Sequence, residues 1–317
     1  MRVAVLCGGL SAEREVSLRS GAQVIRGLCE HGHQAEAVEM DADAWEHLLR
    51  GGYDSVFIAL HGRLGEDGTV QGMLELLGLP YTGSGVLASA LAIDKTRTNQ
   101  LLAAEGLAVP EFEEVGGGSV EPDEVERLVD RYGLPLVVKP VREGSTIGLT
   151  VARDVDEAAS GLVLAGRYDR RVMLQRFVSG VEVTVGLLAT PELEVLPTLE
   201  ILYDNPTYDY DAKYTAGKSR HIIPARIPDP AREAVATAAG RAFRALGCEG
   251  MARVDFIVDE AWTPWVLEVN TIPGLTEVSL LPDAAQAAGI GFGELCERLV
   301  RHSVERHSGT VGPRVRR

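Results

Sequence analysis

Short apolar runs alternate with segments of helical periodicity in the first third of the chain. Strands are expected at 3–7, 34–39 and 55–60, and a helix is expected at 16–29, between the first two strands. Apolar strands separated by helices are typical of βαβ units on a parallel sheet. The pattern therefore predicts an open parallel α/β unit at the N-terminus.

Helix boundary residues organise the middle of the chain. Asp94 is expected to cap a helix that runs to residue 104, and Pro122 and Gly133 mark the two ends of another helix. A strand is expected at 134–139. These elements predict a second folded unit after the N-terminal one.

The last part of the chain is expected to be strand-rich. An alternating strand is expected at 181–187, a helix from 229 to about 246, and two strands at 252–258 and 264–269 that are close enough to form a hairpin. The final residues, 303–317, contain four arginines and one glutamate and are expected to fray.

Composition places the chain among ordinary globular proteins. It has 317 residues, of which 45% are hydrophobic and 24% charged, and this length suits about two domains. The formal net charge of -15 argues against a nucleic-acid or anionic-membrane partner. The basic residues include only four lysines, which makes each one worth examining: Lys95, Lys139, Lys213 and Lys218.

The cysteines and the N-terminus indicate a cytoplasmic location. No CxxC pair occurs among the widely spaced Cys7, Cys29, Cys248 and Cys296, so buried free thiols in a reducing compartment are expected. The first apolar run is too short for a signal peptide, and no 18-residue apolar run occurs, so no membrane partner is expected.

The expected hairpin carries the sharpest chemical signal. Strand periodicity places Arg253 and Asp255 on one face of the first strand, and Glu268 and Asn270 together on the second. Carboxylate and amide oxygens suit Mg²⁺, which takes its other ligands from water and phosphate. A solvated strand face is the alternative, but the constrained Pro-Gly turn at 271–274 favours a functional site.

Two loops could bind phosphate. Lys139 ends a strand and is followed by Gly144, Ser145 and Thr146, whose backbone N–H groups and hydroxyls suit phosphate oxygens; an ordinary turn would explain the glycine but not the lysine. The tyrosine-rich polar segment 203–220 is interpreted as a lid, with an incidental surface loop as the alternative.

Two further candidates follow strands of the first unit. Glu13 opens the helix after the first strand, and His61 follows the third strand in a glycine-rich loop. Ligands of open α/β sheets bind at this edge. The alternatives are a helix-dipole role for the glutamate and a structural role for the histidine.

Together these motifs resemble the D-alanine–D-alanine ligases of the ATP-grasp superfamily, in the same order over nearly the whole chain. The residues that carry the resemblance are Gly8–Gly9 with Ser11–Ser17, Ala59–Arg63 with Gly65–Gly68, Tyr81–Ser84, Asp94–Lys95, Lys139–Pro140 with Arg142–Ser145, Tyr208–Tyr210 with Ala212–Tyr214, and Glu268–Asn270 with Pro273–Gly274.

The resemblance implies a fold and a reaction. The fold is α/β, with three-domain ATP-grasp architecture: an open parallel α/β domain at 1–93 and two α+β domains at 94–178 and 179–317 that sandwich the nucleotide, with the lid at 203–220. The reaction is the ATP-dependent ligation of two D-alanine molecules through an acyl phosphate, which supplies peptidoglycan precursor synthesis. The resemblance also implies a homodimer.

The resemblance assigns the nucleotide and metal contacts. Lys95, Lys139 and Lys213 would neutralise the phosphates of ATP. Mg²⁺ or Mn²⁺, as two ions, would be held by Asp255, Glu268 and Asn270. The remaining ATP contacts would be Ser145, Gln175, Arg176, Val178, Glu182 and Asn270.

The amino-acid contacts come from the same resemblance. Glu13 would hold the ammonium group of the first D-alanine, with His61 nearby. Arg253 and the Gly274 N–H would stabilise the tetrahedral oxyanion. The carboxylate of the second substrate would bind at Ser279 and Leu280. In the lid, Tyr214 would hydrogen-bond with Ser145 and Glu13 and exclude water from the closed site.

The sequence departs from the family pattern at two places. Gln175-Arg176 stands where many members have Glu-Lys, and Thr207 stands where an aromatic residue is common. Tyr214 resembles the group of enzymes that form D-alanyl-D-alanine rather than the D-lactate depsipeptide. Competing interpretations are another ATP-dependent carboxylate–amine ligase and a nucleotide-binding regulator. A dehydrogenase is disfavoured because the third glycine of GxGxxG is missing after Gly8-Gly9.

Overall fold

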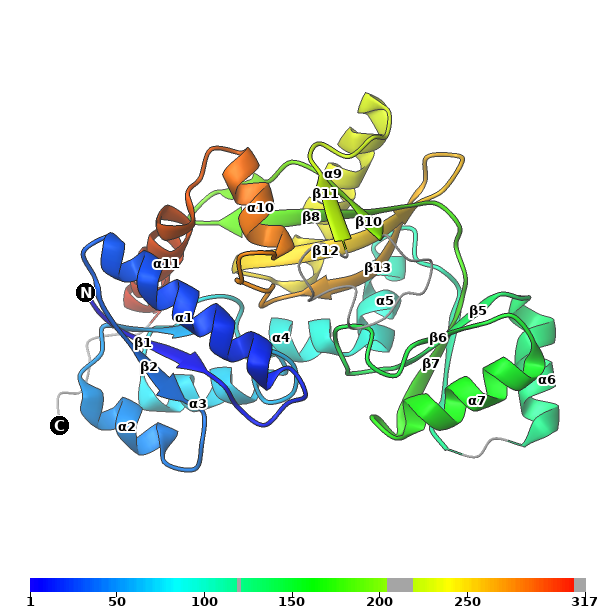
Figure 1. The fold of residues 1–317 in the computed structure, drawn as a ribbon, viewed down its shortest axis with the longest axis horizontal. Helices are drawn as coiled ribbons and strands as arrows, with labels where there is room; N and C mark the ends of the chain where they lie inside the picture. The colour runs from blue at the N-terminus through cyan, green and yellow to red at the C-terminus, as the bar shows by residue number, and fades with distance from the viewer. Residues whose placement is uncertain (119–120, 204–218, 311–317) are drawn as a thin grey trace.

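A computed structural model describes residues 1–118, 121–203 and 219–310 of the chain (Figure 1). Most of the segment that we expect to be a lid, including Thr207, Lys213, Tyr214 and Lys218, lies outside the described residues.

The N-terminal part is a parallel sheet with helices, as expected. Its strand order is β2-β1-β3, and β1 pairs in parallel with both neighbours. The third strand is two residues shorter than expected and ends at Ile58, although the N–H of Ala59 still donates to the carbonyl of Leu6. The elements are β1 (Arg2–Cys7), α1 (Arg14–Glu30), β2 (Gln34–Glu39), α2 (Ala44–Gly51), β3 (Ser55–Ile58) and α3 (Thr69–Leu77).

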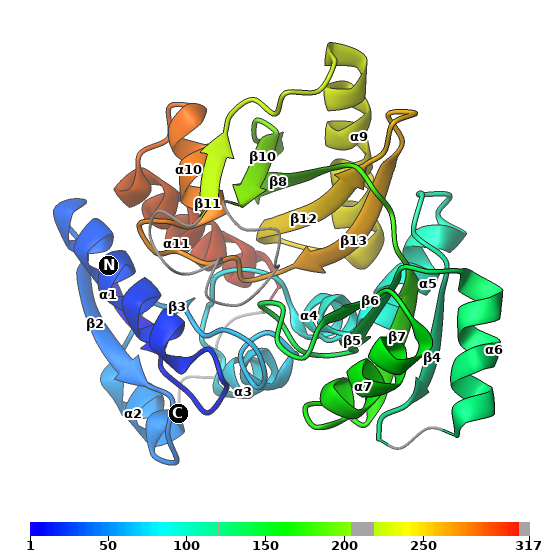
Figure 2. The ribbon, with the colours of Figure 1, turned by 45° about the vertical axis from the view of Figure 1, so that its right-hand side comes forward.

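The middle part contains an antiparallel sheet of order β4-β7-β5-β6, with α6 and α7 beside it (Figure 2). The expected cap of α5 is confirmed, because the Asp94 carboxylate accepts a hydrogen bond from the N–H of Arg97. The elements are α4 (Val86–Ile93), α5 (Lys95–Ala104), β4 (Phe112–Gly116), α6 (Pro122–Tyr132), β5 (Leu136–Pro140), β6 (Thr150–Ala152), α7 (Val155–Gly166) and β7 (Arg171–Arg176).

A larger antiparallel sheet has the order β11-β10-β8-β12-β13, and β9 pairs with the C-terminal end of β8. The expected hairpin is confirmed as β12 and β13. The elements are β8 (Val181–Ala189), β9 (Leu193–Val195), β10 (Leu199–Tyr203), β11 (Ser219–Ile222), α9 (Asp229–Leu246), β12 (Gly250–Val258) and β13 (Pro264–Asn270).

The expected strand at 181–187 is confirmed as β8, and most of it is buried. Residues 183–188 are buried on both faces. Val185 packs in a core with residues of α9, whereas Leu188 packs in a different core with Leu281 of the C-terminal part. A strand that is covered on both faces needs no polar face.

The last two helices, α10 (Leu280–Ala287) and α11 (Phe292–Thr310), join the core of the N-terminal sheet. The expectation of fraying from residue 303 is wrong for 303–310, which belong to α11. Ser303 is buried and its hydroxyl hydrogen-bonds with that of Ser55, and the Arg306 guanidinium donates to the carbonyls of Tyr81 and Gly83. Residues 311–317 lie outside the described residues, and the domain boundaries at 93/94 and 178/179 stay predictions.

The cysteines are free thiols, as expected, but not all of them are buried. Cys29 is exposed near the end of α1, whereas Cys7, Cys248 and Cys296 are buried. Burial raises the pKa of Cys248 and that of Cys296 to about 12. No helix in the described part of the chain is both long enough and apolar enough to cross a membrane.

Candidate functional site

The β12–β13 hairpin brings the four expected polar residues onto one face. Arg253 is the register partner of Asn270, and Asp255 is the register partner of Glu268. All four line the same cavity. The alternative of a solvated strand face is excluded for Asp255, because only 8% of its surface is exposed.

Cationic side chains flank both carboxylates of the hairpin. The guanidinium of Arg253 donates to both oxygens of Asp255, at 2.8 and 2.7 Å, and the Thr184 hydroxyl donates to the same carboxylate at 2.6 Å. Lys95 Nζ lies 3.5 Å from a carboxylate oxygen of Glu268. Each of the two facing carboxylates therefore has a cationic partner that offsets its charge.

The same residues fit a hard divalent cation. No cluster of three or more His, Cys, Asp or Glu side chains suited to a metal occurs in the described residues. The protein would therefore provide a metal ion with only two carboxylates and one amide oxygen at this place. Asn270 Oδ1 accepts a hydrogen bond from the N–H of Ile272 at 2.9 Å, and a carbonyl oxygen retains a second lone pair. Mg²⁺ keeps several waters and takes phosphate oxygens, so a small protein donor set suits it.

The loop after β5 approaches Glu13. Ser145 and Thr146 both have left-handed backbone conformations, with φ of 52° and 65°. Such a conformation is costly for residues other than glycine and recurs at functional sites. The Ser145 hydroxyl donates to the Glu13 carboxylate, and a Cβ on Gly144 would lie 3.2 Å from that same carboxylate. Glu13 and Ser145, which are far apart in sequence, are therefore in direct contact.

His61 is buried in a polar contact network beside Glu13. Its Nδ1 hydrogen-bonds with the carbonyl of Ile272 at 3.1 Å, and its Nε2 lies 3.1 Å from the Ser20 hydroxyl. Burial lowers the pKa of His61, but the neighbouring carboxylate of Glu66, 3.5 Å from Nδ1, raises it above its ordinary value. His61 therefore connects α1 to the 271–274 turn.

Ser279 and Gly274 are in contact after the turn. The Ser279 hydroxyl accepts a hydrogen bond from the N–H of Thr276 at 2.9 Å and lies 2.8 Å from the Thr276 hydroxyl. A Cβ on Gly274 would come within 2.8 Å of Ser279 Oγ, so only glycine fits there without a shift. Leu280, the first residue of α10, lines the cavity beside Ser279.

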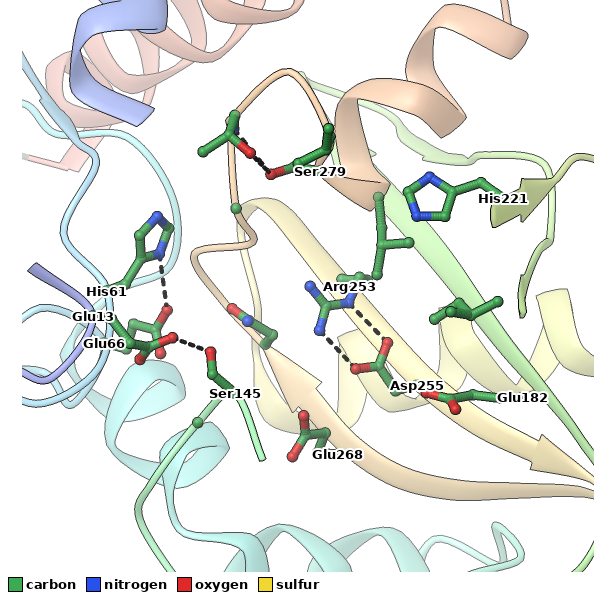
Figure 3. Close-up of a pocket in the computed structure, with 17 residues that line it drawn as sticks. Glu13, His61, Glu66, Ser145, Glu182, His221, Arg253, Asp255, Glu268 and Ser279 are labelled. Atoms are coloured by element: carbon green, nitrogen blue, oxygen red, sulfur yellow. Dashed lines mark hydrogen bonds and ion pairs between the residues drawn. The ribbon is translucent and has the colours of Figure 1, made fainter. Parts of the chain in front are cut away.

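Three adjoining cavities share lining residues and run from the N-terminal part to the antiparallel sheets (Figure 3 shows the first). The inner cavity is lined by Glu13, His61, Arg253, Ser279 and their neighbours. The middle cavity shares Gly144, Asp255 and Glu268 with it and adds Lys95 and Lys139. The outer cleft shares Lys139 with the middle cavity and is lined by Gln175, Arg176, Val178 and Glu182.

Every expected site residue that the structure describes thus lines one of these cavities. Figure 3 shows Glu13 and Ser145 on one side of the inner cavity and Arg253 and Asp255 on the other. Gln175 is 2% exposed, and its Nε2 has no hydrogen-bond partner among the described residues. Arg176 is exposed.

Sequence reasoning assigned no separate role to three residues of this region. Glu66 lies beside His61, inside a motif that the sequence did single out. Glu143 lines the middle cavity, where burial and then the charge of Glu13 raise its pKa. His221 lines the inner cavity from β11, and nothing in its sequence neighbourhood signalled this.

The comparisons with known proteins decide the family. Residues 101–301 match the family described as "D-ala D-ala ligase C-terminus", and residues 44–84 match "D-ala D-ala ligase N-terminus". The D-alanine--D-alanine ligase of Desulforudis audaxviator is 49% identical over 308 residues, covering 96% of this chain and 99% of that protein. That of Pelotomaculum thermopropionicum is 48% identical, with coverages of 96% and 97%.

The chain belongs to the D-alanine–D-alanine ligase family. Solved structures of the family agree with its fold, which is that of ATP-grasp enzymes. A Bacillus anthracis D-alanine--D-alanine ligase complexed with ATP is 32% identical and superposes with a TM-score of 0.83, covering 98% of this chain and 99% of that chain. The VanG D-Ala:D-Ser ligase of Enterococcus faecalis is 29% identical with a TM-score of 0.80, covering 95% and 99%.

Proposed function

We propose that this protein ligates two D-alanine molecules to D-alanyl-D-alanine and converts ATP to ADP and phosphate. The carboxylate of the first D-alanine attacks the γ-phosphate, and the amine of the second attacks the resulting acyl phosphate. The observation that carries the proposal is the row of adjoining cavities, whose lining residues suit in turn the amino acids, the phosphates and the base of ATP.

The outer cleft suits the adenosine part of ATP. The buried amide of Gln175 can donate from Nε2 and accept at its oxygen, and this is the pair of roles that an adenine edge requires. Val178 adds apolar contact, Arg176 borders the cleft and Glu182 suits the ribose hydroxyls. The mixed apolar and polar lining is typical of a small-molecule site.

The middle cavity suits the phosphates. Lys95 and Lys139 are both nearly buried there, with 6% and 7% of their surfaces exposed. We assign them to the phosphates, and we assign Lys213, which lies outside the described residues, to the γ-phosphate by resemblance. Ammonium groups in a poorly hydrated site neutralise phosphate charge that would otherwise repel the attacking carboxylate.

Asp255, Glu268 and Asn270 would hold Mg²⁺ or Mn²⁺, as two ions, at the junction of the middle and inner cavities. Bound divalent ions neutralise charge on the transferring phosphoryl group. Lys95, which is 3.5 Å from Glu268, can then exchange its carboxylate contact for a phosphate contact. Lys95 would therefore have an anionic partner both before and after the nucleotide binds.

The inner cavity suits the amino acids. Glu13, oriented by Ser145, would receive the ammonium group of the first D-alanine, with His61 behind it. Arg253 and the Gly274 N–H would stabilise the oxyanion of the tetrahedral intermediate. The carboxylate of the second D-alanine would bind at the Ser279 hydroxyl and Leu280. Tyr214, outside the described residues, is assigned to lid closure by resemblance.

The biological setting is also a proposal. The family supports a role in peptidoglycan precursor synthesis, a cytoplasmic location and a homodimer.

The test measures phosphate release from ATP by the purified full-length chain with Mg²⁺ and D-alanine, and identifies the dipeptide by mass. L-alanine, D-serine and D-lactate serve as comparison substrates. We expect turnover with D-alanine to exceed that with each of the others. Phosphate release without preference for the D-isomer would remove the assignment, and equal depsipeptide formation with D-lactate would remove the second-substrate specificity.

A further inference from the structure

His221 is a histidine of the inner cavity to which the proposed reaction gives no role. It lies on β11 opposite Ile201 of β10, and both residues line the cavity. Directly opposed residues of an antiparallel pair share one face of the sheet, so this face is turned toward the cavity. Figure 3 shows the His221 ring on the same side of the cavity as the beginning of α10.

Asp283 fixes the orientation of the His221 ring. Nδ1 of His221 lies 2.5 Å from Oδ2 of Asp283, in the first turn of α10. Side-chain exposure is 14% for His221 and 37% for Asp283, so the contact is partly shielded from water. Because Nδ1 is occupied, Nε2 is the nitrogen that can meet a ligand, and it has no hydrogen-bond partner within the described ranges.

The charges around this ring explain what it can bind. The inner cavity is lined by the carboxylates of Glu13, Glu66, Glu182, Asp255 and Glu268. Arg253 also lines it, but both oxygens of Asp255 already accept hydrogen bonds from its guanidinium. These carboxylates would repel a substrate carboxylate at Ser279, and so would Asp283, which lies one helical turn away on α10. His221 also lines the cavity, and its ring adds a second nitrogen donor to it beside Arg253.

A substrate carboxylate at Nε2 would place an anion beside each nitrogen of the ring, because Asp283 already lies beside Nδ1. An imidazole with an anion at each nitrogen is stabilised as the imidazolium, which donates from both nitrogens. Such charge-assisted hydrogen bonds are short and strong.

We propose that His221, oriented by Asp283, is a binding residue for the carboxylate of the second amino acid. This inference rests on the proposed function and deepens it by adding a contact to the Ser279 subsite. The Nε2–H donates to the incoming carboxylate, while the Nδ1–H remains on Asp283. The role is selective for the second substrate, because Glu13 lies on the opposite side of the inner cavity from His221 (Figure 3), and His221 does not line the outer cleft.

The test compares wild type with His221→Gln in steady-state rates over a wide range of D-alanine, which separates the KM values of the two D-alanine sites. We expect the second KM to rise about tenfold, equivalent to about 1.4 kcal/mol. The first KM, the KM for ATP and kcat should stay within about twofold. Asp283→Asn should raise the second KM less than His221→Gln does. The second KM of the double variant should not exceed that of His221→Gln, because the two residues act as one unit.

The control is His47→Gln. His47 also pairs with a polar partner, the Tyr53 hydroxyl at 2.9 Å, but it lies on α2 away from the cavities. An unchanged second KM in His221→Gln overturns the inference, as does a fall in kcat alone or an equal rise of all KM values. If His221→Gln does not fold, the second KM is measured in Asp283→Asn instead, and an unchanged value there overturns the inference. Failure of the proposed function differs from these outcomes, because wild type itself would then lack D-alanine-dependent phosphate release.

Discussion

The carboxylates of Asp255 and Glu268 face each other across the β12–β13 pair, and a cationic side chain contacts each of them. Like charges at directly opposed positions of a sheet are destabilising. Arg253 and Lys95 offset that repulsion in the free enzyme. The arrangement therefore stabilises the two proposed metal ligands as a facing pair before metal and nucleotide bind.

The first prediction concerns this pair. Asp255→Asn removes the charge of a proposed metal ligand and the ion pair with Arg253, so we expect turnover to fall at least about 100-fold. The Mg²⁺ concentration needed for half-maximal activity should rise. Initial rates over a Mg²⁺ titration at saturating ATP and D-alanine measure both effects.

Glu260→Gln is the matched control, because it also removes one carboxylate but lies exposed in the turn of the same hairpin. It should leave both values unchanged. A wild-type Mg²⁺ profile in Asp255→Asn would show that this carboxylate does not bind metal.

The second prediction concerns Gly274. In Gly274→Ala the new Cβ would lie 2.8 Å from Ser279 Oγ, which is itself held by Thr276. Ser279 must therefore move, and we expect the KM of the second D-alanine to rise several-fold. The free energy of unfolding should fall by about 1–3 kcal/mol, the usual cost of overpacking.

Gly291→Ala is the control for this glycine, because a Cβ added at that position would have no heavy atom within 4 Å. Substrate kinetics and urea unfolding should be near wild type. If Gly274→Ala behaved like this control, close packing between Gly274 and Ser279 would not position the subsite.

Local sequence patterns predicted the parts of the site that local structure determines. Strand parity was sufficient to place Asp255 and Glu268 on one face, and the Asp94 cap was sufficient to start α5 at Lys95. Parallel pairing of the first sheet followed from its apolar strands.

Local sequence patterns could not predict the contacts between elements that are far apart along the chain. Ser303 is buried only because α11 returns to β3, more than 240 positions away along the chain. The contact between His221 and Asp283 likewise depends on how β11 and α10 pack. The direct contact between Glu13 and Ser145 was not predicted either, because the family resemblance gave them only a common lid partner, Tyr214.

The third prediction concerns the thiols. At pH 8.5 in native conditions a thiol reagent should modify Cys29 quickly, because it is exposed, while Cys248 and Cys296 stay protected by burial. Unfolding in urea should expose them. Mass spectrometry of alkylated protein gives the number of modified sites, and Cys29→Ser should abolish the fast modification.

Alkaline pH should reveal the same burial. The pKa of Cys248 and that of Cys296 rise from 9.0 to about 12 in the folded protein, so folding favours the protonated thiols. Their stabilisation is complete below pH 9 and is lost as the pH rises toward 12. We expect Cys248→Ala to weaken the decline of unfolding free energy between pH 9 and pH 11. A decline of unchanged slope would contradict this linkage.

The last prediction concerns the start of α5, which carries Lys95. The Arg171 guanidinium donates to Glu114 at 2.7 and 2.6 Å and also to Asp94. These hydrogen bonds hold the pKa of Glu114 below its ordinary 4.5. Burial raises the pKa of Asp94, but the hydrogen bonds from Arg171, Arg97 and Thr96 bring it below 3.8.

The sign of the pH effect follows from these shifts. A carboxyl whose pKa is lowered by folding contributes stability above its unfolded pKa and loses it as the pH falls through its folded pKa. Arg171→Gln should therefore cost about 2 kcal/mol of unfolding free energy at pH 7. The difference from wild type should shrink between pH 4.5 and pH 2, as Glu114 and Asp94 become protonated in both proteins.

Arg50→Gln is the comparison, because Arg50 makes an exposed pair with Glu46 one helical turn away, and such pairs contribute little. Urea unfolding from pH 2 to pH 7 measures all three proteins. If the deficit of Arg171→Gln stayed constant over that range, it would arise from lost packing, since only the ionic contribution depends on the charge of Asp94 and Glu114. A deficit that vanishes in acid would instead show that charge fixes the N-terminus of α5, and with it the position of Lys95 beside Glu268.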